Sequence, residues 1–227
     1  MCRLFGITKF DIEHHLGLAM DFFALAEKGN VPPDHKPGHL DGWGIGWYKG
    51  GHGEIVKSGK PITSEKELFL STIRSIGKAD ILILHLRLSA WKGTEYKEHA
   101  HPFLLHNAML AHNGTIKDYK DMLGEPAFTG FDTEALLRFA LKQNSWSVKK
   151  AFTAAVSKIR KNYSYSALNL LFSDGKNLFA LREFTKWPEY YTLYDADYHG
   201  SKVVCSERIT SKLDWTVLPQ NEIKAYT

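Results

Sequence analysis

Segments typical of β-strands lie at both ends of this chain, with most of the helix-like segments between them. Strands are predicted at 2–8, 43–48, 81–88 and 108–112. The C-terminal third adds a predicted hairpin of 167–172 and 178–182, joined by a turn at 173–175, and further strands at 190–194, 202–205, 215–218 and 223–226. Because this order is not a repeat of β–α–β units, it predicts an α+β protein with antiparallel sheets.

Four segments are predicted to be helices, at 14–28, 64–76, 132–143 and 147–161. Ser64 is the expected N-cap of the second helix, with Glu67 completing a capping box. No repeat and no linker interrupts the 227 residues. We therefore predict a single domain over 1–227.

Composition excludes several classes of protein. Hydrophobic residues make up 44% and charged residues 24%, as in globular domains rather than disordered or fibrous chains. The apolar runs are too short to cross a bilayer, and none follows the N-terminus as a secretory signal would. Two cysteines, Cys2 and Cys205, cannot form a disulfide framework. We therefore expect a cytoplasmic protein with no membrane partner.

The charge pattern gives no sign of a nucleic-acid partner. The net charge is +4 with neutral histidines, and the basic residues are scattered along the chain. A mild basic cluster within 149–161 lies on a predicted helix, where it is most simply a solvated face. We therefore expect no binding to nucleic acid.

Cys2 follows the initiator methionine directly, and a small second residue usually allows that methionine to be removed. Cys2 would then carry a thiol and a free α-amine, with unperturbed pKa values of about 8.5 and about 7.7–8.0. The neutral amine can take the thiol proton and later return it to a leaving amine. If Met1 is retained, the nitrogen is an amide without that basicity. Position alone favours the simpler interpretation, a small buried residue at the start of a strand.

Asn113-Gly114 supports two interpretations. Asn-Gly is the preferred pair of a two-residue hairpin turn, and with Thr115 it also forms a glycosylation sequon. Alternatively, the Asn113 side-chain amide and the Gly114 backbone N–H form an oxyanion hole, where the missing side chain lets a substrate approach closely. Taken alone, the pair favours the turn.

Arg87 and Asp132 are charged residues at predicted element ends. Arg87 ends an apolar strand, where it either reaches solvent or offers a planar fork to a carboxylate. Asp132 begins a predicted helix, where the simplest role is that of an N-cap.

The histidines raise a metal hypothesis, which remains the minor interpretation. His-x-His on an extended segment points its two rings to opposite sides, and neither a cysteine pair nor a helical His-Glu motif supports zinc. The glycine-rich segment 42–46 lacks both the dinucleotide spacing and a Walker lysine, so we predict no phosphate cradle and no cofactor. The histidines considered as ligands are His99 and His101, together with His85, His106 and His112, and more weakly His35 and His39 beside Asp41.

Taken together, the motifs resemble the class II glutamine amidotransferases, which are N-terminal-nucleophile hydrolases. Their order matches that of the family from residue 2 to about residue 207, which is nearly the whole chain. The motifs are Met1-Cys2-Arg3-Leu4-Phe5-Gly6, Asp41-Gly42-Trp43-Gly44-Ile45-Gly46-Trp47, His85-Leu86-Arg87, His101-Pro102-Phe103, His112-Asn113-Gly114 and Asp132-Thr133-Glu134, with Ser206-Glu207 as a further element.

The resemblance implies a fold, an activity and a set of roles. The fold would be a four-layer αββα sandwich with two antiparallel sheets. Cys2 would attack the side-chain amide of glutamine, form a γ-glutamyl thioester and release ammonia, with its own α-amine as base and then acid. The implied roles of the other residues are the oxyanion hole for Asn113 and Gly114, the substrate carboxylate for Arg87, the substrate ammonium for Asp132, and pocket shape for His101.

Three features leave the physiological reaction open. Phe131 stands where the family usually has Thr before the substrate-binding Asp, which could alter the preferred substrate. The chain shows no synthase domain, which leaves two alternatives. Either a separate synthase chain accepts the ammonia, or the protein hydrolyses a γ-glutamyl peptide or a γ-glutamyl thiol compound with water as the acceptor. If Met1 is retained, the protein would instead be a catalytically silent binding or regulatory subunit.

Overall fold

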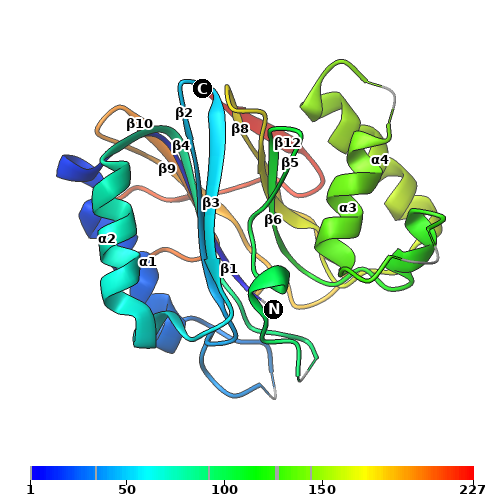
Figure 1. Cartoon of the computed structure of the whole chain (residues 1–227), viewed down its shortest axis with the longest axis horizontal. Coiled ribbons are helices and arrows are strands. Elements are labelled where there is room, and N and C mark those ends of the chain that lie inside the picture. Colours follow the sequence, from blue (N-terminus) through cyan, green and yellow to red (C-terminus); the bar gives the residue numbers. More distant parts are fainter. Residues whose placement is uncertain (1, 34, 92, 126–127, 144) are drawn as a thin grey trace.

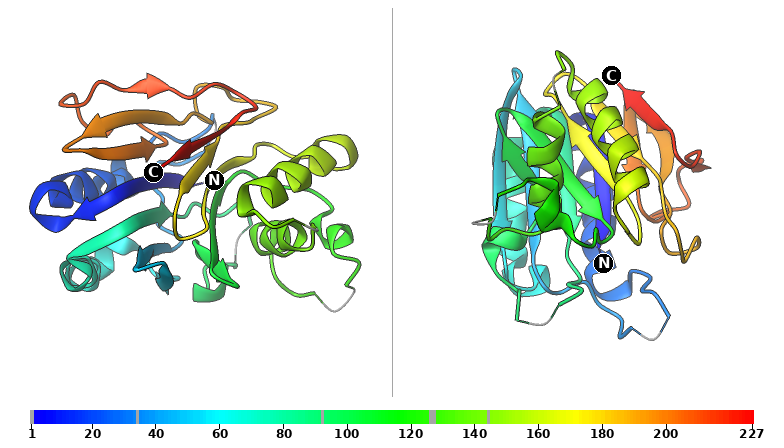
Figure 2. Two further views of the ribbon diagram at one scale, coloured as in Figure 1. Left: turned by 90° about the horizontal axis from the view of Figure 1, so that it is seen from above. Right: turned by 90° about the vertical axis from the view of Figure 1, so that its right-hand side faces the viewer.

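Two antiparallel sheets pack face to face, and a pair of helices covers the outer face of each (Figure 1). The computed structural model describes residues 2–33, 35–91, 93–125, 128–143 and 145–227. α1 (Ile12–Lys28) and α2 (Lys66–Ile76) cover the first sheet, and α3 (Asp132–Leu141) and α4 (Val148–Asn162) lie over the second (Figure 2). The predicted α+β fold with four αββα layers is confirmed.

The strands divide between the sheets as follows. The first sheet has the order β11 (Thr216–Val217), β9 (Tyr194–Tyr198), β10 (Ser201–Cys205), β1 (Arg3–Asp11), β4 (Lys78–Leu86), β2 (Trp43–Lys49) and β3 (His52–Ser58). The second has the order β12 (Ile223–Tyr226), β8 (Leu178–Leu181), β7 (Asn169–Ser173), β6 (Ala108–Asn113) and β5 (Phe103–Leu105).

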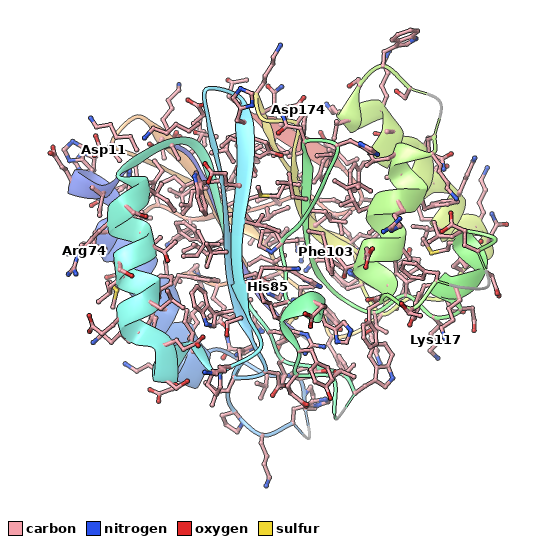
Figure 3. The ribbon with its side chains drawn as sticks, viewed as in Figure 1. Asp11, Arg74, His85, Phe103, Lys117 and Asp174 are labelled. Atoms are coloured by element: carbon pink, nitrogen blue, oxygen red, sulfur yellow. The ribbon has the colours of Figure 1, made fainter. Side chains whose placement is uncertain are left out.

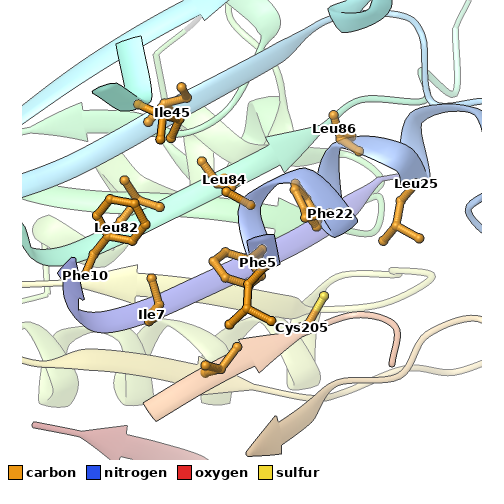
Figure 4. Close-up of a cluster of buried hydrophobic side chains, with 14 of the residues drawn as sticks. Phe5, Ile7, Phe10, Phe22, Leu25, Ile45, Leu82, Leu84, Leu86 and Cys205 are labelled. Carbon is orange, nitrogen blue, oxygen red and sulfur yellow. The ribbon is translucent and has the colours of Figure 1, made fainter. Parts of the chain in front are cut away.

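β1 lies in the middle of the first sheet, paired with β10 on one side and β4 on the other. Because side chains alternate along a strand, its residues contact two different cores. Phe5 and Ile7 pack in the cluster beneath α1, together with Phe22 (Figure 4). Leu4 packs between the sheets, in the same cluster as Leu171. Cys2 is two residues before Leu4 and therefore shares the face that meets the second sheet.

The start of β1 is close to the ends of several other strands. Arg3 pairs with Leu86 at the end of β4, and Asn113 at the end of β6 pairs with Asn169 at the start of β7. Antiparallel pairing thus gathers four strand ends at one edge of the sandwich, near the N-terminus in Figure 1. Side chains carried to this edge can contact one another although they are far apart in the sequence.

The predicted capping box at the second helix is wrong. Residues Ile62–Glu65 form a turn of 3₁₀ helix, and α2 begins only at Lys66, without a side-chain cap. The Ser64 hydroxyl donates to the Pro61 carbonyl at 2.8 Å instead of accepting from a helical N–H. Pro61 precedes the turn with φ of −56°, so the chain begins to coil before the expected cap.

The strand prediction was also wrong for three segments. A strand was expected at 190–194, but β9 begins at Tyr194, and the Tyr190 and Tyr191 N–H groups donate to Trp187 O in a turn. The rings of Tyr190 and Tyr191 pack on Ala167, so these aromatic residues belong to a buried cluster and not to a strand. β3 and β5 were not predicted, because β3 is a partly exposed edge strand without clear alternation and β5 has only 3 residues.

None of the helices in the described ranges combines the length and the apolar character needed to span a lipid bilayer.

Gly44 leaves room for the backbone that leads into β5. A Cβ built at Gly44 would lie 2.2 Å from the His101 carbonyl oxygen, whereas a Cβ at the exposed Gly17 on α1 meets nothing within 4 Å. We expect Gly44→Ala to lower the free energy of unfolding by about 1–3 kcal/mol, because the backbone must shift. Gly17→Ala should raise it by about 0.5–1 kcal/mol. Urea unfolding measures both, and equal effects would contradict this view of the packing.

Candidate active site

A small cavity lies at the edge where the strand ends meet. Its volume is about 40 Å³, and five of the predicted site residues are among those that line it, namely Cys2, Arg87, His101, Gly114 and Asp132. The sixth, Asn113, lies against the Cys2 nitrogen. The structure therefore brings all six together from positions spread over 131 residues. Figure 3 shows the neighbouring His85 near the centre of the molecule, between the two sheets.

The Cys2 nitrogen donates a hydrogen bond to Asn113 Oδ1 at 2.8 Å. This bond joins the start of β1 in one sheet to the end of β6 in the other. Asn113 is fully buried, and its Nδ2 has no hydrogen-bond partner among the described residues. A buried amide donor without a partner is costly, so this N–H₂ is available to an acceptor that the protein itself does not provide.

Gly114 follows Asn113 where the chain passes close to another segment. A Cβ at this position would lie 2.0 Å from Ala167 O, so only glycine fits. The His112 ring also contacts this segment. Its Nε2 donates to Ala167 O at 3.0 Å, and its Nδ1 lies 3.1 Å from the Thr133 hydroxyl. The end of β6 is thus tied to α3, which carries Asp132.

The interpretation of Asn113-Gly114 as a hairpin turn is wrong. Asn113 ends β6, which is paired with both β5 and β7, and the tight connection in this region joins β5 to β6 at His106 and Asn107. Both of those residues have positive φ, of 47° and 61°, as a two-residue turn of this kind requires.

Arg87 is 6% exposed, so the interpretation of a strand end reaching solvent is wrong. Its Nη1 donates to the carbonyls of Asp41 at 3.2 Å and Thr94 at 2.7 Å. Its Nη2 donates to the hydroxyls of Ser89 at 3.1 Å and Thr94 at 3.0 Å. All four acceptors are uncharged oxygens, and Arg87 has no carboxylate partner within the described ranges.

Asp132 is the first residue of α3 rather than its N-cap, which is Phe131. Its Oδ1 accepts from Thr133 N and its Oδ2 from Ile116 N, each at 2.9 Å. Asp132 is 7% exposed and makes no ion pair with any described residue, so its charge and that of Arg87 are both uncompensated by the protein.

His101 and His85 form a buried pair with ring centroids 4.2 Å apart. Burial lowers the pKa of both imidazoles well below the usual range, and the neighbouring cations lower it further. Both rings are therefore neutral near pH 7 and act here as packing surfaces.

The metal hypothesis gains no support from the geometry. The His99 ring packs edge-on against Phe131, whereas the His101 ring packs on His85. Across the described ranges, no group of three or more His, Cys, Asp or Glu side chains is arranged to hold a metal ion.

Phe131, the departure from the family motif, belongs to an aromatic wall of the cavity. Its ring centroid is 5.8 Å from that of Trp91 and 4.1 Å from that of His99, and all three residues line the cavity. A hydroxyl at position 131 would offer a hydrogen bond, whereas the phenyl ring offers apolar surface.

Sequence reasoning missed the polar cluster beneath Cys2. Arg3 is fully buried, and its Nε lies 3.0 Å from Glu207 Oε1 and 3.2 Å from His39 Nε2. Its guanidinium stacks over the Tyr190 ring, and the Tyr190 hydroxyl donates to Cys2 O at 3.4 Å. The available signal was a charged residue inside a central strand, because burying a guanidinium is costly unless it is paired or hydrogen-bonded.

The comparisons with known proteins give the family. A model described as "Glutamine amidotransferases class-II" matches residues 1–219. The chain belongs to this family. The chain is also 28% identical, over 196 residues, to an uncharacterized protein of Methanocaldococcus jannaschii. That alignment covers 81% of this chain and 51% of the relative, so the chain spans about half the length of this curated relative.

Solved structures of the family share the fold. The glutamine phosphoribosylpyrophosphate amidotransferase of B. subtilis superposes with a TM-score of 0.69 at 17% identity, over 99% of this chain and 49% of its own. A glutamine aminotransferase class-II domain protein of Silicibacter pomeroyi gives 0.66 at 17% identity, over 99% and 94%. A predicted glutamine amidotransferase of Pseudomonas aeruginosa gives 0.53 at 18% identity, over 99% and 96%. The family model thus confirms the expected family. Whether Met1 is removed or retained, which the sequence leaves open, concerns a residue outside the described ranges.

The buried histidines predict a stability that falls in mild acid. Burial lowers the pKa of His39 to about 2 and also lowers those of His85 and His101. Below about pH 6.5 the unfolded chain binds protons that the folded chain excludes. Each histidine therefore lowers the free energy of unfolding by up to about 1.4 kcal/mol for each pH unit below that value. Denaturant unfolding between pH 7 and 5.5 should show this slope, and His85→Leu should reduce it. A slope unchanged by His85→Leu would contradict the assignment.

Proposed function

We propose that this protein cleaves the side-chain amide of glutamine through a Cys2 γ-glutamyl thioester and releases ammonia. The observation that carries the proposal is the hydrogen bond from the Cys2 nitrogen to Asn113, whose Nδ2 is left without a partner among the described residues. The Asn113 amide thus binds the nitrogen of the nucleophile through its oxygen, while its N–H₂ is free to donate to an oxyanion. Family membership supports the same conclusion.

The first step needs the nitrogen of Cys2 as a free amine, which requires removal of Met1. The neutral amine then takes the thiol proton, and the thiolate sulfur attacks the amide carbon of glutamine. The carbon–oxygen double bond opens and leaves a negative charge on the oxygen. As this intermediate collapses, the carbon–nitrogen bond breaks, the ammonium of Cys2 returns its proton to the leaving group, and ammonia departs.

Asn113 Nδ2 and the Gly114 N–H are the proposed donors to the oxyanion. Asn113 Oδ1 is fixed by the Cys2 nitrogen, so the amide need not reorient when charge develops. Donors that are already in place cost no reorganisation at the moment of reaction.

Arg87 and Asp132 are suited to an amino acid substrate. A buried charge without a partner is unfavourable, and the cavity holds one of each sign. The carboxylate and ammonium of an α-amino acid would pair with Arg87 and Asp132 respectively. The carboxylate would replace uncharged acceptors such as Thr94 at the guanidinium, and a charged acceptor binds there more strongly.

Water completes the reaction if no other acceptor is present. The Cys2 amine would take a proton from water, hydroxide would attack the thioester carbon, and glutamate would leave as the thiol regains its proton. Ammonia would pass to a separate synthase chain or into solvent. The proposal includes both destinations of ammonia, a separate synthase chain or solvent, and it places the reaction in the cytoplasm.

The aromatic wall favours a second candidate function, hydrolysis of γ-glutamyl amides that carry an apolar group. Phe131, Trp91 and His99 present rings to the cavity where the family motif would place a hydroxyl. A panel of glutamine and γ-glutamyl amides of increasing apolar size separates the two candidates. The best substrate by kcat/KM would be glutamine for the first and an apolar γ-glutamyl amide for the second.

Cys2 should be the thiol that reacts with a γ-electrophilic glutamine analogue. Intact mass spectrometry should show loss of Met1 and addition of one label, and Cys2→Ala should abolish both labelling and ammonia release. Cys205→Ala is the matched control, because burial raises the pKa of the Cys205 thiol to about 12 and keeps it unreactive. Full glutaminase activity in Cys2→Ala protein would refute the mechanism.

Loss of the Asn113 donor should slow the chemical step. We expect Asn113→Ala to lower kcat by roughly 10²–10³. Arg87→Gln should instead cost about 2–5 kcal/mol in kcat/KM, because the substrate carboxylate would be left unpaired. Asn162→Ala, at an exposed Asn on α4 whose amide donates to Lys158 O, is the control for the first variant. Ammonia release measures all three, and a wild-type kcat for Asn113→Ala would rule out the proposed oxyanion hole.

A further inference from the structure

A second buried asparagine beside the site has a donor that the proposed mechanism does not use. Asn169, the first residue of β7, is fully buried. Its Oδ1 accepts from Glu183 N at 2.9 Å, which fixes the orientation of the amide. Its Nδ2 has no hydrogen-bond partner among the described residues. An unpaired buried donor is unfavourable and calls for an explanation.

Asn169 stands directly opposite Asn113 in the ladder of β6 and β7. Opposed residues of an antiparallel pair share a face, with Cβ atoms about 4.5–5.5 Å apart. Asn113 uses that face to contact the Cys2 nitrogen at 2.8 Å. Leu171, two residues further along β7, packs between the sheets together with Leu4, two residues after Cys2. Asn169 therefore lies at the level of Cys2, in the layer between the sheets.

Asn169 is not among the described residues that line the cavity, and the same is true of Asn113, which contacts the Cys2 nitrogen. The role considered for Asn169 is therefore that of a positioning residue, which acts on the reaction through Cys2.

We propose that Asn169 Nδ2 donates a hydrogen bond to the lone pair of the Cys2 α-amine once Met1 has been removed. In the chain as encoded, this nitrogen is a peptide amide, whose lone pair is delocalised and accepts no hydrogen bond. It can only donate, and Asn113 Oδ1 takes that bond. Processing converts the nitrogen into an acceptor and gives the Asn169 donor its partner in the resting enzyme. That bond opens when the same lone pair takes the thiol proton. The inference rests on the proposed function in one respect, namely that Met1 is removed and the α-amine of Cys2 is free.

The consequence is a more neutral amine. A hydrogen bond donated to the neutral form of a base disfavours its protonated form, so Asn169 lowers the pKa of the amine. The Cys2 nitrogen would then remain a free base at a pH where an ordinary α-amine, with a pKa of about 7.7–8.0, is partly protonated. Other titratable groups face Cys2 from neighbouring elements and are constant in the test below: His85, Arg87, His101, Asp132, Tyr190 and Tyr191.

Two substitutions separate the donor from the acceptor of the Asn169 amide. Asn169→Asp keeps an oxygen for Glu183 N but replaces the donor with a second acceptor, whereas Asn169→Ala removes both. The matched control is Asn162→Asp, which makes the same chemical change on α4. All are made in the Cys205→Ala background, so that Cys2 is the one cysteine, and the mature N-terminus is verified by intact mass.

The readout is the titration of the amine itself. Protein labelled with ¹³C at the cysteine Cα, with its thiol blocked as the methyl disulfide, is titrated by NMR. We expect the amine midpoint to rise by about 0.5–1 pH unit in Asn169→Ala and further in Asn169→Asp, with no change in Asn162→Asp. The acidic limb of kcat/KM for ammonia release should move in the same order.

The outcomes distinguish the inference from the proposed function. Equal midpoints in the parent, Asn169→Ala and Asn169→Asp would overturn the inference, even if both variants melt at a lower temperature, because a merely structural role moves the Tm alone. Shifted midpoints in a protein that releases no ammonia would sustain the inference and overturn the proposed function. If Asn169→Asp fails to fold, Asn169→Ser supplies the second variant and is expected to raise the midpoint as Asn169→Ala does.

Discussion

One hydrogen bond between the two sheets defines the site, from the Cys2 nitrogen to Asn113 Oδ1. It joins residues 111 apart in the sequence, so it exists only if both sheets are complete and packed. The central position of β1 and the ladder of β6 with β7 together determine where its two atoms lie. The four-layer fold thus brings the start of β1 against the end of β6.

The same bond explains why the site needs so few moving parts. By fixing the oxygen of the Asn113 amide, it orients the N–H₂ as a donor, and only glycine can follow because Ala167 O leaves no room for a side chain. Close packing thus places the donors of the proposed oxyanion hole before any charge develops. Arg87, in contrast, already donates to the hydroxyls of Ser89 and Thr94.

Much of this arrangement was predictable from the sequence, and the rest depended on tertiary contacts. Cys2, Arg87, Asn113 and Asp132 were predictable as site residues because their motifs occur in a fixed order, but each motif alone favoured a structural role. The oxygen of Asn113 could not be assigned to the Cys2 nitrogen, nor could Asn169 be singled out, because both depend on the register of β6 with β7. Two local patterns gave wrong predictions. The helix cap predicted at Ser64 lies in a 3₁₀ turn that follows Pro61, and the strand predicted from Tyr190 is a turn whose rings pack in a buried cluster.

Two sets of buried charges are balanced in opposite ways, and this contrast bears on the proposed function. Arg3 faces away from the cavity and is paired with Glu207, whose carboxyl has a pKa raised by burial and held back by that guanidinium. That pair is internally neutral, so it supports the strand without calling for a ligand. Arg87 and Asp132 are equally buried but have only uncharged partners among the described residues. Since buried charges without charged partners are unfavourable, their presence at one cavity supports the proposal of a zwitterionic substrate.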